Sequence, residues 1–202
     1  MASGQDRFIK RLRLACDSTA FAANIGLDDL KRRFGAENVV ALDSIYVGEG
    51  FYARVSVVYR DTRAQRVDIA WRDSVAHRNP AWIHVAGDST QWTTDEGITI
   101  GTRLRTLEHI NGGPFRVAGF GFDGSGFIQR GWSEGSLSHW GQPACSLSAR
   151  LRPIVFDEAD RRWANQVSTG RFFSSGHLAM QALDPRISEI WLEFKTATPN
   201  RK

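Results

Sequence analysis

The stretch of residues 111–135, NGGPFRVAGFGFDGSGFIQRGWSEG, limits what this chain can fold into more than any other segment. Glycines alternate with large aromatic residues along it, and a short helix-like segment comes directly before it. Residues 119–124 have the G-x-G-x-x-G spacing of dinucleotide-binding loops. Such a loop must lead from a strand into a helix, whose N-terminus then meets the pyrophosphate. Here a strand-like segment follows the motif and the helix precedes it, so we expect no cofactor.

The same stretch is better explained as antiparallel strands separated by glycine-rich turns. The strand-like segments are residues 115–122, 127–132 and 136–140, which together predict a β-meander. Phe115 and Val117 alternate on odd positions, whereas Phe120 and Phe122 alternate on even positions. This change predicts a β-bulge near Gly119, because glycine suits irregular backbone within a strand.

Two short segments, residues 25–35 and 102–112, have the spacing of amphipathic helices that end in glycine. The helical face of the first is formed by Leu27, Leu30 and Phe34, and the corresponding positions of the second are Leu104, Leu107 and Asn111. Asn24 is the predicted N-cap of the first helix, and Gly35 its C-terminal stop. A third short helix is predicted over residues 177–183, with Ser174 or Ser175 as its cap.

Strand-like segments follow each of the first two helices. Beyond the meander they are residues 39–42, 44–47, 52–59, 66–71, 81–85, 145–155 and 187–195. The pattern of helix and then strands therefore occurs twice. We expect an α+β protein made of two tandem units, residues 1–90 and 91–202, each a short helix plus an antiparallel β-meander. One continuous domain with a single sheet is the alternative.

This layout resembles the helix-plus-sheet modules of the β-lactamase-inhibitor-protein-like group, which includes small outer-membrane assembly lipoproteins. The resemblance is carried by Ile25-Gly26 through Phe34-Gly35 and by Ile100-Gly101 through Gly112-Gly113-Pro114-Phe115. It covers residues 25–72 and 98–140, and residues 115–132 also look like a segment of uncharacterised exported bacterial proteins. The resemblance implies a periplasmic, non-enzymatic protein that binds another protein. It supplies no catalytic residues.

Composition and charge exclude several classes of function. The formal net charge of +4 is scattered along the 202 residues, without the basic stripe that nucleic-acid binding would favour. The chain contains no run of about 18 apolar residues, so we expect no transmembrane segment. Arg11, Arg13 and Asp17 interrupt any signal-peptide pattern near the N-terminus. The periplasm is therefore implied by the resemblance alone, and the cytoplasm is the alternative location.

The two cysteines, Cys16 and Cys145, allow two interpretations. In an exported protein they could form a disulfide between the N-terminal segment and a late strand. In a cytosolic protein they would be two buried free thiols.

Residue types that carry catalysis are present but are not arranged in a known motif. The five histidines lack the close spacing of a zinc motif, so no metal site is predicted. No G-x-S-x-G elbow occurs. Asp123, Glu134 and His139 could form a dispersed hydrolase-like site, which is the first alternative to a binding function. A small-ligand or lipid carrier, with an apolar cavity between helix and sheet, is the second.

The aromatic residues are the remaining candidates for a working surface. The chain has seven tryptophans, more than most chains of its length. Most should supply core, because small sheets need large side chains to bury enough area. Others could line an exposed sheet face, as interface hot spots do. We expect Phe122, Trp132 and Trp140, on adjacent predicted strands, to form such a face. The leading hypothesis is thus a non-enzymatic binding or inhibitor-type protein that recognises a protein partner, with oligomeric state undefined.

Overall fold

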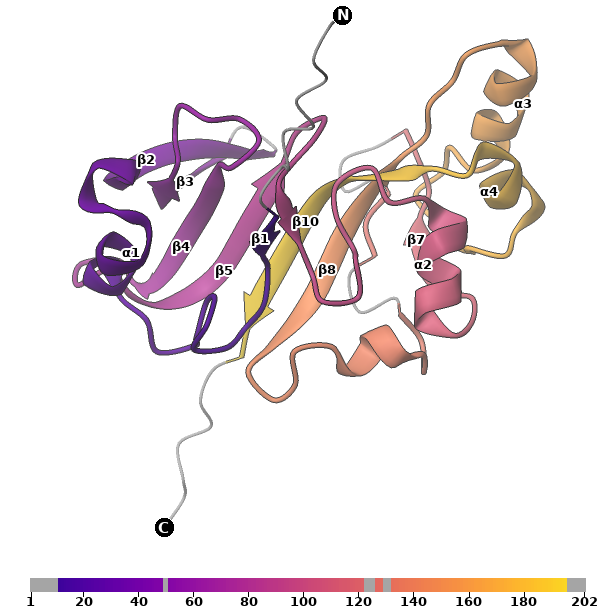
Figure 1. Cartoon of the computed structure of the whole chain (residues 1–202). Helices are drawn as coiled ribbons and strands as arrows, with labels where there is room; N and C mark the ends of the chain where they lie inside the picture. Colours follow the sequence, from indigo (N-terminus) through magenta and orange to yellow (C-terminus); the bar gives the residue numbers. More distant parts are fainter. Residues whose placement is uncertain (1–10, 49–50, 122–125, 129–131, 196–202) are drawn as a thin grey trace, which may run out of the picture.

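The central feature of the fold is one six-stranded antiparallel sheet with the strand order β2-β3-β4-β5-β10-β8 (Figure 1). The computed structural model describes residues 11–48, 51–121, 126–128 and 132–195. The strands of this sheet are β2 (Val39–Gly48), β3 (Phe51–Val58), β4 (Val67–Asp73), β5 (Arg78–Ala86), β8 (Cys145–Arg152) and β10 (Arg186–Phe194). The predicted α+β class is confirmed.

Four α-helices and two small sheets complete the described part of the chain. The helices are α1 (Leu27–Phe34), α2 (Leu104–Asn111), α3 (Glu158–Gln166) and α4 (Leu178–Leu183), with 3-10 turns η1 (Ala36–Asn38) and η2 (Ser136–His139). One small sheet pairs β1 (Leu12–Arg13) with β6 (Trp92–Thr93), and the other pairs β7 (Arg116–Ala118) with β9 (Phe172–Ser174). Figure 1 shows α1 at the β2–β4 end of the large sheet, and α2, α3 and α4 toward the opposite end. Among the described residues, no helix is both long and apolar enough to cross a membrane.

The two faces of the large sheet differ in what covers them. Leu30 of α1, Leu104 and Leu107 of α2 and Met180 of α4 are buried in one continuous core against the first face. The second face has a smaller apolar cluster to which only strand residues contribute in the described part of the chain: Val40, Ile45, Ala53, Val55, Val57, Ala70, Ala81 and Trp82. None of the four helices therefore contributes a buried side chain to the second face of the sheet.

The helix predictions for α1, α2 and α4 are confirmed, but the predicted caps of α1 and α4 are wrong. The N-cap of α1 is Gly26, whose N–H donates to Asp29 Oδ2 at 2.8 Å. The N-cap of α4 is His177, whose Nδ1 accepts the N–H of Ala179 at 3.2 Å. The Ser175 hydroxyl instead accepts the N–H of Phe115 at 2.9 Å. This hydrogen bond joins two segments that are distant in sequence, so Ser175 does not cap α4. Helix α3 was not predicted.

Helices α1 and α2 are attached to the sheet by the same pair of backbone hydrogen bonds. Leu27 N donates to His77 O at 3.0 Å, and Asn79 N donates to Ile25 O at 3.0 Å. In the second half of the chain the corresponding bonds are Leu104 N to Pro185 O and Ile187 N to Thr102 O, both at 2.9 Å. Each helix therefore begins where a central strand, β5 or β10, begins. These two strands pair with each other, so one sheet runs through both predicted units.

The first predicted unit contains the expected meander, β2-β3-β4-β5, but the meander predicted over residues 115–140 is wrong. Strand β7 has three residues and pairs with β9, which is distant in sequence. Residues 126–128 instead lie along the edge of β8, where Ile128 N donates to Ala149 O at 2.8 Å. Residues 136–139 form η2. The aromatic residues of this stretch pack between layers, as Phe115 does against Trp132 with ring centroids 5.0 Å apart.

The β-bulge expected near Gly119 is absent, because β7 ends at Ala118. Gly119 instead allows its segment to pass close to the backbone of residues 167–169. A Cβ atom at Gly119 would lie 2.3 Å from the carbonyl oxygen of Thr169 and 2.6 Å from that of Val167. Only glycine lets the chain pass these carbonyl groups.

We therefore expect Gly119→Ala to lower the free energy of unfolding by about 2–3 kcal/mol, because neither backbone carbonyl can move aside freely. Urea denaturation measures this change. Gly113→Ala is the matched control, since a Cβ there meets no atom within 4 Å; it should change stability by less than about 0.5 kcal/mol. Equal effects of the two substitutions would show that the close contact at Gly119 does not restrict which residue can occupy this position.

Cys16 and Cys145 form a disulfide, with their Cα atoms 6.2 Å apart. The bond links the segment before α1 to the first residue of β8 across a sequence separation of 129 residues. Cys145 is fully buried in the core, whereas Cys16 is half-buried and packs against it.

Replacing both cysteines by serine should lower the free energy of unfolding by about 3–5 kcal/mol, because a long loop is released in the unfolded chain. Urea denaturation with and without a reducing agent tests this expectation. Reduction should bring the wild-type midpoint toward that of the double variant and leave the variant unchanged. A wild-type urea midpoint that is the same with and without the reducing agent would contradict this expectation.

Candidate functional site

The second face of the sheet, to which the described helices contribute no buried side chain, carries a row of aromatic and ionisable side chains centred on Trp191. Directly opposed residues of antiparallel strands project from the same face. Trp191 of β10 stands opposite His84 of β5 and opposite Ser148 of β8, and His84 stands opposite Asp68 of β4. We call this row and its neighbours the Trp191 face, which comprises Asp68, Trp82, His84, Ser148, Glu189 and Trp191.

The aromatic rings of this face are stacked across the strands. The His84 and Trp191 rings are stacked with centroids 4.5 Å apart, and Phe127 lies 4.8 Å from Trp191 on a neighbouring segment. Trp82 meets His84 edge-on at 6.3 Å. All four residues are half-buried, and the His84 side chain is 12% exposed. The rings therefore form a packed, partly buried aromatic row on this face of the sheet.

Ion pairs cross the same face and hold His84 between two carboxylates. Its Nε2 lies 3.1 Å from Glu189 Oε2, and its Nδ1 lies 3.6 Å from Asp68 Oδ2. Arg66 pairs with Asp68 at 2.8 Å and Arg150 with Glu189 at 3.3 Å, so charges alternate along the row. Burial lowers the pKa of His84, but the two carboxylates outweigh burial and raise this pKa above its usual value. Burial raises the pKa of Glu189, but His84 and Arg150 outweigh that effect and hold it below its usual value.

Two buried side-chain polar atoms lack a hydrogen-bond partner among the described residues, and both adjoin Trp191. They are His84 Nδ1 and Ser148 Oγ. His84 Nδ1 still faces the Asp68 carboxylate at ion-pair distance. Ser148 is only 2% exposed, and its hydroxyl has no such compensation. Unpaired buried polar groups cost stability and are rare in native structures, so their position marks a place of interest.

A polar hollow with a volume of about 590 Å³ adjoins the Trp191 face at Ser148. Ser146, Ser148 and Glu193 line it from the sheet, and Ser138 and Gln142 line it from the loop around η2. Its size is that of a small-molecule site. We call it the Ser148 hollow.

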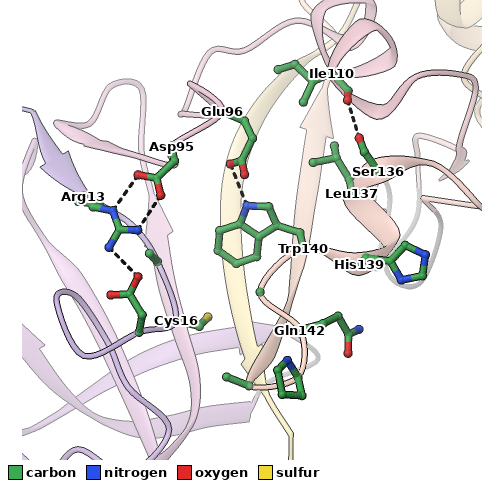
Figure 2. A pocket seen from close by; sticks show the side chains of 15 residues that line it. Arg13, Cys16, Asp95, Glu96, Ile110, Ser136, Leu137, His139, Trp140 and Gln142 are labelled. Atoms are coloured by element: carbon green, nitrogen blue, oxygen red, sulfur yellow. Dashed lines mark hydrogen bonds and ion pairs between the residues drawn. The ribbon is translucent and has the colours of Figure 1, made fainter.

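A second hollow, of about 530 Å³, lies between the segment around Arg13, the turn at Asp95 and Glu96, and the loop after η2 (Figure 2). Arg13 forks between Asp95 and Asp17, at 2.6–2.7 Å, and Trp140 Nε1 donates to Glu96 at 2.9 Å. Hydrogen bonds from Thr19, together with Arg13, lower the pKa of Asp17 to about 2. These carboxylates already have partners within the hollow, which makes it a weaker candidate than the Trp191 face.

Of the three aromatic residues predicted to form a partner-binding face, the structure describes Trp132 and Trp140 and gives them different surroundings. Phe122 lies outside the described residues. Trp132 is 3% exposed, and its Nε1 donates to Leu147 O at 2.8 Å, so its predicted place on an exposed face is corrected to the core. Trp140 is half-buried and lines the hollow of Figure 2, together with Cys16. The prediction failed because residues 132–140 form turns and η2 instead of adjacent strands.

The residues of the hydrolase-like alternative are not gathered in one cavity of the described part. Asp123 lies outside the described residues. His139 lines the hollow of Figure 2, whereas Glu134 is exposed and lines neither hollow. No cluster of three or more potential metal ligands occurs among the described residues.

Trp82 and Trp191 were missed although the sequence contains a signal for them. In β5, Trp82 and His84 alternate with the buried Ile83 and Val85, and in β10 Glu189, Trp191 and Glu193 alternate with Ile190, Leu192 and Phe194. Alternation of this kind places the tryptophans opposite the apolar face.

No protein-family model, curated protein or solved structure matches the chain.

The raised pKa of His84 predicts a pH dependence of stability. A group with a raised folded-state pKa stabilises fully below its unfolded pKa, about 6.5, and this stabilisation is lost as pH rises through the folded pKa. The free energy of unfolding should therefore fall as the pH rises above about 6.5, through the raised folded-state pKa of His84. His84→Gln should remove this dependence and lower stability at pH 6 by about 1.5–3 kcal/mol.

Chemical denaturation across this pH range measures the effect, with the exposed His139→Gln as the matched control. The control should keep the wild-type pH profile. A His84→Gln profile parallel to that of the wild type would contradict the ion-pair geometry.

Proposed function

We propose that this protein is a non-enzymatic binding protein of inhibitor type, which recognises a protein partner through the Trp191 face. The observation that carries the proposal is the half-buried pair Trp82 and Trp191 on the one sheet face to which no described helix contributes buried side chains. Trp71, Trp92 and Trp132 are buried instead. Tryptophan and arginine are the residues most enriched at energetically dominant interface positions.

The arrangement of charge around these rings also supports recognition of a protein. Arg66 and Arg150 flank the aromatic centre, and each has a side chain about one third exposed (31% and 32%). An aromatic centre with a polar, charged rim is the usual anatomy of a specific interface. The internal ion pairs fix the rings before binding, which reduces the entropy lost on association.

The other two candidate functions have less support. A hydrolase-like site needs its residues in one cavity, whereas His139 lines the hollow of Figure 2 and Glu134 lines neither hollow. A carrier needs an apolar cavity between helix and sheet, whereas Leu30, Leu104 and Leu107 pack there with at most 1% exposure. Neither feature favours the hydrolase or carrier alternative.

An exported location, such as the periplasm, is part of the proposal. Disulfides form and persist in oxidising compartments and are rare in the cytosol. The Cys16–Cys145 bond supports this location. The matching attachment of α1 and α2 to β5 and β10 supports descent from two related helix-plus-sheet units, as in the inhibitor-like modules that the sequence resembles.

The proposal is tested by capture of partners from the envelope fraction of the source organism on the immobilised chain. Trp82→Ala and Trp191→Ala should each weaken capture at least tenfold, because a hot-spot tryptophan contributes about 1.4 kcal/mol or more. Quantitative mass spectrometry of the eluted proteins measures the loss.

Trp163→Ala is the matched control, because Trp163 is a half-buried tryptophan on α3, outside the Trp191 face. A specific partner should be retained by the wild type and the control and lost by both face variants. Circular dichroism establishes that each variant is folded. Partners captured equally by all four proteins would overturn the proposal.

A further inference from the structure

The Ser148 hollow has the chemistry of a ligand site that is separate from the protein-binding role. We propose that it binds a saccharide unit, a neutral polyhydroxylated ligand, which hydrogen-bonds to the Ser148 hydroxyl. The inference does not depend on the proposed function, since the hollow shares only Ser148 with the Trp191 face and none of its aromatic rings lines it.

The unpaired hydroxyl of Ser148 is the first argument. The side chain lines the hollow, is 2% exposed and lacks a hydrogen-bond partner among the described residues. A buried hydroxyl without a partner destabilises the folded state, so a ligand that supplies the bond removes an existing defect. A small polar group seated in the hollow beside Ser148 would do so.

The character of the lining identifies the class of ligand. Serine hydroxyls and the Gln142 amide both donate and accept hydrogen bonds, which matches ligand hydroxyl groups that do the same. Glu193 and Lys195 contribute one charge of each sign, so the charged lining has no net preference for an anion or a cation. Lys195 is itself bonded to Gln142.

The remaining lining is apolar and suits the C–H faces of a sugar ring. Trp132, Leu137 and Phe194 contribute to the wall, and all three belong to the core behind it. A volume of about 590 Å³ exceeds the need of one saccharide unit and leaves room for a second. A purely apolar ligand would leave the Ser148 hydroxyl unpaired, which disfavours a lipid.

The experiment uses the full chain and a panel of free neutral mono- and disaccharides, with binding measured by saturation-transfer NMR and titration calorimetry. At least one sugar should bind saturably to the wild type, and Ser148→Ala should weaken it at least tenfold. Without sugar, Ser148→Ala should keep or raise the urea midpoint, because the lost hydroxyl had no partner. The same sugars attached to a surface as polysaccharides distinguish a polymer-bound source from a free one.

Ser56→Ala is the matched control, because Ser56 is another buried serine of the same sheet whose hydroxyl has partners. Its Oγ accepts the Trp71 Nε1–H at 2.8 Å and donates to Ala41 O at 2.6 Å. This variant should lose stability and keep sugar binding, the reverse of Ser148→Ala. The inference would be overturned if no sugar, free or surface-attached, bound saturably to the wild type. It would also be overturned if Ser148→Ala bound the sugar as well as the wild type does, or lost as much stability as Ser56→Ala. Sugar binding that survives Trp82→Ala would separate this site from the protein-binding face.

Discussion

The pairing of β5 with β10 is the interaction on which the rest of this structure depends. It joins residues 82–86 to residues 189–193, more than a hundred positions apart, in one antiparallel ladder. Helices α1 and α2 each begin at a hydrogen-bonded bridge to the start of one of these strands. β4 extends the sheet on one side and β8 on the other. The disulfide then fixes the N-terminal segment to β8, so both ends of the chain are tied to the same sheet.

The same ladder creates the candidate site. His84 reaches Glu189 and stacks on Trp191 only because β5 and β10 are neighbours in this register. A shift of one residue would turn these groups into the core and expose Ile83 and Leu192. Charged groups on the second face are tolerable because they are paired, and because the helices use the first face for the core. The Trp191 face and the Ser148 hollow both arise on this sheet, in which the described helices pack against a single side.

The sequence predicts much of the local structure and little of the site. Helices α1 and α2 follow from local spacing of leucines, because an isolated helical face is encoded within a few residues. The strands of the large sheet are also indicated locally by β-branched runs. The cap of α1 was misplaced because Asp29 reaches back to the Gly26 N–H, and that contact depends on side-chain geometry. The meander over residues 115–140 failed because its aromatic residues pack between layers, which alternation within one strand does not reveal.

The sequence by itself determined the α+β class, the positions of three short helices and the alternation that gives each central strand one apolar and one polar face. The tertiary structure decided which tryptophans remain half-exposed, since exposure depends on which face the helices cover and on which strand lies opposite. It also decided that Trp132 is core whereas Trp191 is only half-buried, although Trp191 has apolar neighbours in sequence, Ile190 and Leu192, and Trp132 does not. The physical reason is that periodicity is set by neighbours in sequence, whereas burial and ion pairing are set by contacts between residues far apart in sequence.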